Sequence, residues 1–456
     1  MYRAITVNVS QAHFLFGYLE DLTKASCNLR NAALFRMRQV LTFTSKEPSR
    51  WTDNEKFVHN EIETNLPRMG SRYSMPEKKK SFISYRFINA LMSVTCNPDY
   101  YCDKLPRQCA EEVLKDTVRS MKGFFAACRE YARHPEKFTG KPKLPGYSKS
   151  GSCHSVTITN QDCVIYPKPD GSNELKLPLT KARLPLGNVD VSGKLKQVTV
   201  TPFHGIFIIT LVIDSENSEK HIAPSSRAIS IDFGTNNIAA ITNNVGKPCL
   251  LFKGGVIKSV NQWYNKKMAE YVSKQTIGTD QKFIPTRKSQ ALCVWRENHI
   301  SDILHKTACE IIRYCNEWNI STIVIGANKQ QKSEINLGHV NNQQFVQIPF
   351  YRLKQLISYR AERLGITVIE QEESYTSKAS FIDNDEIPVW GETTEIPVFS
   401  GKRIRRGIYK TSDGQLINAD LNGAANIMVK WNKTAFTDNV MPDFNSCKVL
   451  KYPYQK

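Results

Sequence analysis

The sequence lacks an apolar run long enough to cross a membrane. Its longest apolar stretch, Ile206 to Ile213, is interrupted by Thr210, whereas a membrane helix needs roughly 18 to 20 successive apolar residues. The first residues, Met-Tyr-Arg-Ala-Ile-Thr-Val-Asn, also lack the apolar core of a signal peptide. We therefore expect a cytoplasmic protein with no membrane partner.

Closely spaced cysteine pairs are missing too, although the chain contains 12 cysteines. None of them forms a Cys-x-x-Cys pair, the spacing that is typical of structural zinc sites. Several lie on expected helices beside apolar residues, where a free cysteine packs as a small hydrophobic side chain. We expect reduced cysteines and no bound zinc.

Acidic residues are few relative to basic ones. The chain has 43 Asp and Glu against 62 Lys and Arg, which gives a formal net charge of +19. Such an excess favours a polyanionic partner, either a nucleic acid or an anionic membrane. Because the sequence has no membrane-spanning run, a nucleic acid is the expected partner.

Three kinds of pattern follow one another along the 456 residues, a length that allows two or three domains. Residues 11–135 show helical periodicity and predict a helical domain. Short alternating strands at 1–10 and 136–226 predict a small antiparallel β-barrel. Residues 227–456 show three strands, then helices alternating with two further strands, then a last helix. This is the order of a ribonuclease-H-like α/β fold.

Two aspartates stand where such a fold can carry catalytic acids. Asp232 ends the strand Ser-Ile-Asp-Phe-Gly, and Asp420 opens the last helix in Asn-Ala-Asp-Leu-Asn-Gly. Acids at these positions can hold two metal ions that bind the attacking and leaving oxygens of a phosphodiester. An Asp before Gly is also ordinary in turns, and an Asp at a helix start is also ordinary as a cap. The capping role of Asp420 is compatible with a catalytic one.

The fourth strand lacks the glutamate that would complete the site. It reads Thr-Ile-Val-Ile-Gly-Ala-Asn, so Gly326 stands where the acid belongs. The fifth strand is expected to pair with it in parallel about 4.8 Å away and to end at the same edge. This geometry favours Glu373 as the replacement. Glu372 and Glu334 are the alternatives, and Glu334 would require a loop that folds back.

These motifs resemble those of the TnpB proteins of insertion sequences, their eukaryotic relatives the Fanzor proteins, and the type V CRISPR effectors. The resemblance rests on residues 230–237, 323–329, 373–378 and 418–427 and on Met121–Tyr131. It implies an RNA-guided DNA endonuclease with a RuvC-like nuclease domain, a wedge barrel and a helical recognition domain. Asp232 and Asp420 match the first and third RuvC acids. Gly326 with Glu373 matches relatives whose second acid has moved.

One departure from the family concerns zinc. Relatives commonly carry a four-cysteine module before the last acid, but residues 379–417 contain no cysteine and include Gly-Lys-Arg-Ile-Arg-Arg-Gly instead. Cations in this insert would contact phosphates, and the alternative is a solvated basic loop. Lys78–Arg86, which interleaves cations and aromatic residues, is the candidate reader of a short duplex motif beside the target. The candidate nucleic-acid contacts are Lys78, Lys79, Lys80, Tyr85, Arg86, Lys402, Arg403, Arg405 and Arg406.

We therefore expect a magnesium-dependent endonuclease that a guide RNA directs to target double-stranded DNA. Asp232, Glu373 and Asp420 are expected to bind two Mg²⁺ ions, and DNA binding would associate the protein with the nucleoid. A nuclease-inactive, RNA-guided DNA-binding repressor and a guide-free transposase are the alternatives. Loss of the strand-four glutamate permits the repressor, whereas retention of both aspartates favours cleavage.

Overall fold

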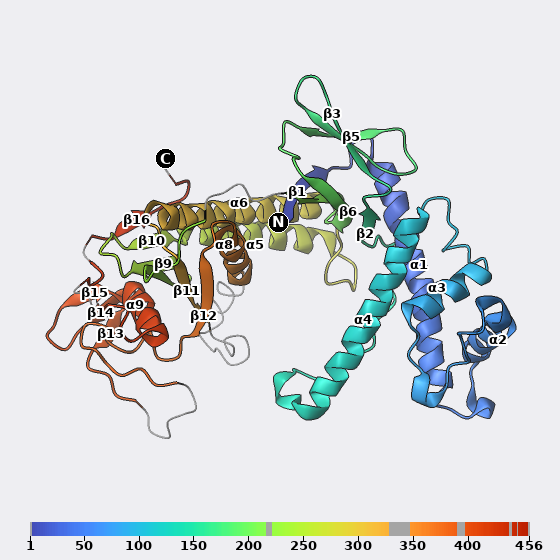
Figure 1. Ribbon diagram of the computed structural model, residues 1–456, viewed down its shortest axis with the longest axis horizontal. Helices are drawn as coiled ribbons and strands as arrows, with labels where there is room; N and C mark the ends of the chain where they lie inside the picture. The colour runs from blue at the N-terminus through green and yellow to red at the C-terminus, as the bar shows by residue number, and fades with distance from the viewer. Residues whose placement is uncertain are drawn as a thin grey trace. The chain divides into compact units, whose positions relative to one another are not determined.

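The computed structural model describes residues 2–215, 221–327, 347–389, 397–436, 440–444 and 446–454. The chain forms two compact units, Met1–Glu216 and Asn217–Lys456 (Figure 1). In these described segments, no helix is both long and apolar enough to span a membrane. The division into three domains that the sequence suggested stays a prediction.

Four long helices dominate the N-terminal half of the first unit. They are α1 (Phe16–Phe43), α2 (Asp53–Met69), α3 (Tyr85–Val94) and α4 (Arg107–Arg133). Each buries an apolar stripe, such as Leu19, Leu22 and Leu29 of α1, in one shared core, as expected of amphipathic helices. Single 3₁₀ turns at Pro48–Arg50, Lys78–Lys80 and Pro135–Lys137 connect or follow them.

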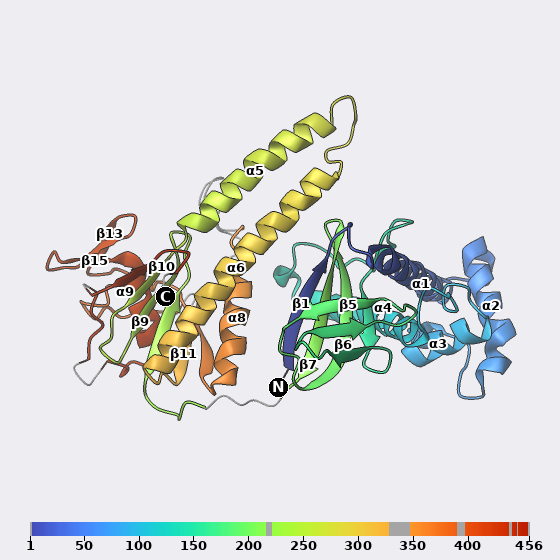
Figure 2. The same cartoon turned by 90° about the horizontal axis from the view of Figure 1, so that it is seen from above.

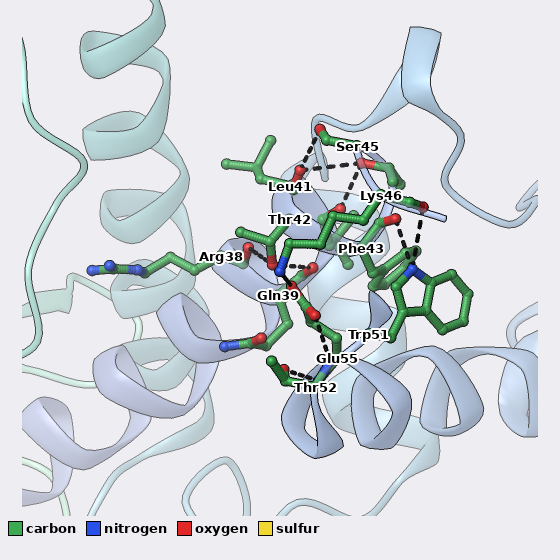
Figure 3. A network of polar contacts seen from close by, with 12 residues as sticks. Arg38, Gln39, Leu41, Thr42, Phe43, Ser45, Lys46, Trp51, Thr52 and Glu55 are labelled. Carbon is green, nitrogen blue, oxygen red and sulfur yellow. Dashed lines mark hydrogen bonds and ion pairs between the residues drawn. The ribbon is translucent and has the colours of Figure 1, made fainter. Parts of the chain in front are cut away.

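A polar network fixes the junction between α1 and α2 (Figure 3). Thr52 and Glu55 form a reciprocal capping box, with the Glu55 amide donating to Thr52 Oγ1 at 3.4 Å and the Thr52 amide donating to Glu55 Oε2 at 2.7 Å. Lys46 pairs with the buried Glu55 at 2.6 Å, and the Trp51 indole donates to the Phe43 carbonyl at 3.1 Å. Burial alone would raise the pKa of Glu55, but the bonds from Lys46 and Thr52 outweigh it and lower that pKa to about 2.

The strands of the first unit form two antiparallel sheets. Two of these strands form a hairpin in which Pro202 pairs with Phe207, and the N-terminal strand joins the same sheet, as the sequence predicted. The four-stranded sheet has the order β1 (Tyr2–Val9), β7 (Ile206–Asp214), β6 (Lys194–Phe203) and β2 (Val156–Thr159). The three-stranded sheet contains β3 (Val164–Pro167), β4 (Asn173–Lys176) and β5 (Arg183–Gly187). Hydrogen bonding in the described residues thus groups these strands into two separate sheets, and a closed barrel stays a prediction.

The second unit is built around a six-stranded mixed sheet of order β12-β11-β8-β9-β10-β16. The three successive strands β8, β9 and β10 form an antiparallel meander, and β11 pairs in parallel with both β8 and β12. The parallel pairing of the fourth and fifth strands is therefore confirmed. The strands are β8 (Ala228–Asp232), β9 (Asn237–Asn243), β10 (Leu250–Lys253), β11 (Thr322–Ala327), β12 (Thr367–Glu372) and β16 (Lys448–Leu450).

Helices cover both faces of this sheet (Figure 1). Because successive strand residues point to opposite faces, Ile229 and Ile231 of β8 enter a core with α6 and α8. Ser230 and Asp232 face the other side, where the Ser230 hydroxyl donates to the Ala424 carbonyl of α9 at 2.6 Å. The helices are α5 (Gly255–Gln275), α6 (Arg287–Glu317), α8 (Phe350–Arg363) and α9 (Ala419–Trp431). Figure 2 shows α5 and α6 side by side as a long hairpin.

The basic insert contains a small antiparallel sheet of β13 (Lys402–Arg405), β14 (Ile408–Lys410) and β15 (Leu416–Asn418), which leads directly into α9. Its Tyr409 side chain is buried and donates to the Lys378 carbonyl at 2.8 Å. Lys402–Arg405 thus form a hydrogen-bonded but solvent-exposed strand instead of a loop, and their contact with phosphates stays a prediction.

Candidate active site

Asp232 lies at the end of β8 on the face that α9 covers. A Cβ added to Gly423 of α9 would stand 2.9 Å from Asp232 Oδ2, closer than packed side chains tolerate. Only glycine therefore lets the helix approach this carboxylate so closely. The Asn-Gly-Ala-Ala sequence of α9 brings the helix backbone against the edge of the sheet where Asp232 lies.

Asp420 lies in the first turn of α9 without serving as its cap. The cap is Asn418, whose side chain accepts from the amides of Asp420 at 3.0 Å and Leu421 at 3.1 Å. The Asp420 carboxylate instead accepts from Asn237 Nδ2 at 2.7 Å and from Arg403 Nη2 at 3.1 Å. It is thus available to the site as a ligand and not spent on the helix terminus.

The Glu373 carboxylate occupies the space above Gly326. A Cβ built on Gly326 would overlap Glu373 Oε2, and it would stand 2.7 Å from Ile427 Cδ1 of α9. Gly326 lies on the same strand face as Ser230 and Asp232, across one parallel strand pairing. The carboxylate from the next strand therefore fills the place that an acid on β11 itself would take.

Contacts on both sides of Glu373 hold it there. Before it, β12 pairs with β11 along its whole length. After it, the segment 374–381 is bonded to α9 through two buried asparagines. Asn426 Nδ2 donates to the carbonyls of Thr376 and Ala379, both at 2.8 Å, and Asn422 Nδ2 donates to Ala379 at 2.7 Å. The segment that follows Glu373 and the helix that carries Asp420 are thus tied together.

The two alternative acids have different outcomes. Glu372 forms an ion pair with the buried amine of Lys430 and accepts from the Ser374 amide at 2.6 Å. Although burial opposes it, these bonds lower the pKa of Glu372, so this carboxylate is committed to a structural pair. Glu334 lies outside the described residues.

Charge repulsion at Asp232 places this carboxylate close to the other two acids. Burial, then the charges of Glu373 and Asp420, hold the pKa of Asp232 well above its usual range, and Arg403 partly opposes this. Burial and the charge of Glu372 raise the pKa of Glu373 to about 7, while Lys430 acts in the opposite direction. A buried carboxylate whose pKa is raised by neighbouring acids, as that of Asp232 is, is typical of sites that bind cations or transfer protons.

Carboxylate oxygens are suitable ligands for a hard divalent cation, although these side chains do not converge on one position. Among the residues that the structure describes, no three Asp, Glu, His or Cys side chains form a ready metal-ligand group. Asn237, however, is buried, and its Oδ1 is without a hydrogen-bond partner while its Nδ2 holds Asp420. An unpartnered amide oxygen on the side chain that holds Asp420 adds an oxygen ligand of the kind that magnesium-type ions prefer.

The basic candidates fall into two groups. Arg403 reaches Asp420, and Arg406 Nη2 donates to Thr235 Oγ1 at 3.1 Å, beside the same site. Lys402 and Arg405 are exposed on β13, the strand that also carries Arg403.

The remaining candidates lie in the first unit. Lys78, Lys79, Lys80 and Arg86 are exposed there. Tyr85 is used in packing, since its hydroxyl donates to Glu111 at 3.3 Å.

Sequence reasoning passed over Asn237 and Gly423. Both stand within the conspicuous motifs Asp-Phe-Gly-Thr-Asn-Asn and Ala-Asp-Leu-Asn-Gly. A polar residue that begins a fully buried strand was the available signal for Asn237. A glycine near the start of an otherwise good helix was the signal for Gly423.

Two segments of the chain match known families. Residues 210–332 match OrfB_IS605, described as a probable transposase, and residues 350–427 match the Cas12f1-like TNB domain. The TnpB-like protein ORF457 of Acidianus two-tailed virus is 25% identical over 228 residues, which is 48% of this chain and 45% of the viral protein. This match spans less than half the length of that relative.

The structure also resembles a solved one. The Cas12f1 chain of a complex with sgRNA and target DNA aligns with a TM-score of 0.53 at 13% identity, over 90% of this chain and 81% of that one. At this identity the match shows a shared fold alone. Together with the two family segments, it confirms the resemblance predicted from the motifs. One segment of the chain thus matches an OrfB-type transposase model and another matches a Cas12f1-like TNB domain, and the chain is similar to a TnpB-like protein in sequence and to a Cas12f1 in fold.

Proposed function

We propose that this protein is an RNA-guided DNA endonuclease whose RuvC-type site consists of Asp232, Glu373 and Asp420. The observation that carries the proposal is the Glu373 carboxylate above Gly326, next to the two aspartates. A protein that only binds DNA has no use for a buried acid that compensates for the one missing from β11. The relationship to TnpB and to a Cas12f1 solved with guide and target supports the nucleic-acid partners.

The three carboxylates and Asn237 Oδ1 would hold the metal, for which Mg²⁺ is the natural choice among oxygen-preferring ions. Two such ions, when bound, stabilise the charge on the phosphodiester oxygens and lower the pKa of a bound water. Asn237 orients Asp420 through its amide. Arg403 brings a cation to the same carboxylate and would turn to a phosphate oxygen once metal neutralises the acid. The sheet and α9 keep these groups in place during the reaction.

The test begins with the protein purified together with any bound RNA. That RNA is sequenced, and double-stranded DNA that matches it is incubated with the complex and Mg²⁺. Glu373→Gln should slow cleavage at least about 100-fold, since the site loses a charged ligand, while RNA and DNA binding persist. Glu370→Gln is the matched control, because Glu370 is on the same strand but exposed, paired with Lys354 at 2.5 Å.

Each other outcome has a distinct meaning. If Glu373→Gln cuts at the parental rate, the second acid is Glu372 or Glu334. If the wild-type complex binds the guide-matched DNA without cutting it, the protein is an RNA-guided repressor. If no RNA copurifies and DNA is still cut, it is a guide-free transposase.

A further inference from the structure

Two cations outside the carboxylate cluster meet at the turn between β8 and β9. Arg406, just after β13, donates from Nη2 to Thr235 Oγ1 at 3.1 Å. Lys258, in the first turn of α5, donates from Nζ to Asn236 Oδ1. This turn begins at Asp232, so both cations stand on the backbone segment that presents the first catalytic acid.

The charges of this pair are not balanced by an acid. Over the described part of the chain, neither Lys258 nor Arg406 forms an ion pair with a carboxylate, and each bonds to a neutral side chain. Burial and, after it, the charge of Arg406 lower the pKa of Lys258. Two cations held within reach of each other repel, and an anion bound between them would relieve that repulsion.

The start of α5 adds hydrogen-bond donors at the same place. Gly254 is the N-cap residue of α5, where no side chain accepts a hydrogen bond from the helix amides, and the first turn carries no acid. The amides of this turn and the positive end of the helix dipole therefore favour an anion. The Gly254 amide donates to the Asn236 carbonyl at 2.7 Å. A Cβ on Gly254 would stand 2.6 Å from the Thr235 carbonyl oxygen, so glycine is needed for the helix to begin against this turn.

We propose that Lys258 and Arg406, with the first turn of α5, bind a backbone phosphate of the DNA strand next to the scissile phosphodiester. The inference rests on the proposed function and adds where the strand is held. A guanidinium, an ammonium and backbone amides are the donors that phosphate oxygens select. Holding a neighbouring phosphate at the turn that carries Asp232 sets the register of the strand over the three carboxylates.

The test pairs protein variants with DNA from which single charges are removed. Guide-matched DNA is prepared with one uncharged methylphosphonate at each position around the cut. We expect one position at which the substitution slows wild-type cleavage about 10-fold or more, the usual effect of a lost charged hydrogen bond. On DNA with the methylphosphonate at that position, Lys258→Gln and Arg406→Gln should cleave as fast as wild type, because the phosphate contact is already absent. Lys410→Gln, an exposed cation on β14, should behave as wild type at every position.

A second readout does not depend on cleavage. In the Glu373→Gln background, the dependence of DNA affinity on salt should become shallower by about 0.7 log units per log of salt when both substitutions are combined, because one phosphate contact is lost. If the protein substitution and the methylphosphonate slow cleavage independently at every position, so that their fold-losses multiply, the two cations only stabilise the turn. In that case the inference is wrong. It is also wrong if Lys258→Gln and Arg406→Gln match Lys410→Gln in both readouts. If wild type cuts no guide-matched DNA, the proposed function fails, and the salt dependence still decides the phosphate site.

Discussion

Gly326→Ala tests, with a single added methyl group, whether the Glu373 carboxylate needs the space above Gly326. The added Cβ would overlap Glu373 Oε2 and stand 2.7 Å from Ile427 Cδ1, which is buried in α9. Ile427 belongs to a packed helix, whereas the Glu373 carboxylate ends a longer side chain. Most of the adjustment therefore falls on the carboxylate, which must move by about 1 Å to reach ordinary contact distance.

The two consequences differ in size. Overpacking of this kind costs about 1–3 kcal/mol of stability, which a chain of this size tolerates. A shift of about 1 Å in a catalytic group costs about 100-fold in rate. We therefore expect Gly326→Ala to fold and to bind RNA and DNA, but to cleave about 100-fold more slowly than wild type.

The assay compares single-turnover cleavage of guide-matched DNA with urea unfolding of the same preparations. Gly123→Ala is the control, because a Cβ there meets no atom within 4 Å, and alanine within a helix favours folding. A Gly326→Ala protein that cuts at the wild-type rate would refute the placement of the second acid above β11. A loss of cleavage together with a loss of DNA binding would show a folding defect, and it would equally contradict the expectation that the variant folds.

The remaining predictions concern pH and stability. Mg²⁺ binding to the site should strengthen as pH rises through about 7, because the cation must displace the proton of Glu373, whose pKa burial raises to about 7 in the metal-free protein; an equal Mg²⁺ affinity at pH 6 and pH 8 would contradict this. Without metal, the folded protein binds more protons than the unfolded chain between pH 4.5 and about 7, so its stability should fall as pH rises across that window, less so in Glu373→Gln. Thr52→Ala removes the capping box before α2 and should lower the free energy of unfolding by about 1 kcal/mol. An unchanged urea midpoint for Thr52→Ala would contradict this, and it would show that the Lys46–Glu55 ion pair suffices to hold the junction between α1 and α2.

Local patterns predicted much of the second unit. The alternation and length of apolar runs identified β8, β11 and β12, and the parallel pairing of β11 with β12 followed from the connecting helix. That pairing favoured Glu373 over the alternatives Glu372 and Glu334, and its role as the second acid stays a prediction. The choice depended on which strand edges meet, a property that the order of elements largely determines.

Contacts between distant segments could not be predicted in this way. β16 pairs with β10 although about 200 residues separate them, and three residues carry too weak a periodic signal to mark a strand. The basic residues of the insert indicated phosphate binding, but not that Arg403 reaches Asp420. Such a pair depends on how β13 is placed against α9, which follows from packing and not from local propensity.

The width of one strand pairing prescribes which residue type can serve at position 373. The acid must cross from the end of β12 to the space above Gly326 on β11, a sideways step of about 4.8 Å. Glutamate, with its additional methylene group, has the reach for this step, and aspartate is one carbon short. On β8, where Asp232 stands directly beneath α9, the shorter acid is the one that fits. The spacing between strands thus favours the longer acid, glutamate, after β12 and the shorter acid, aspartate, on β8.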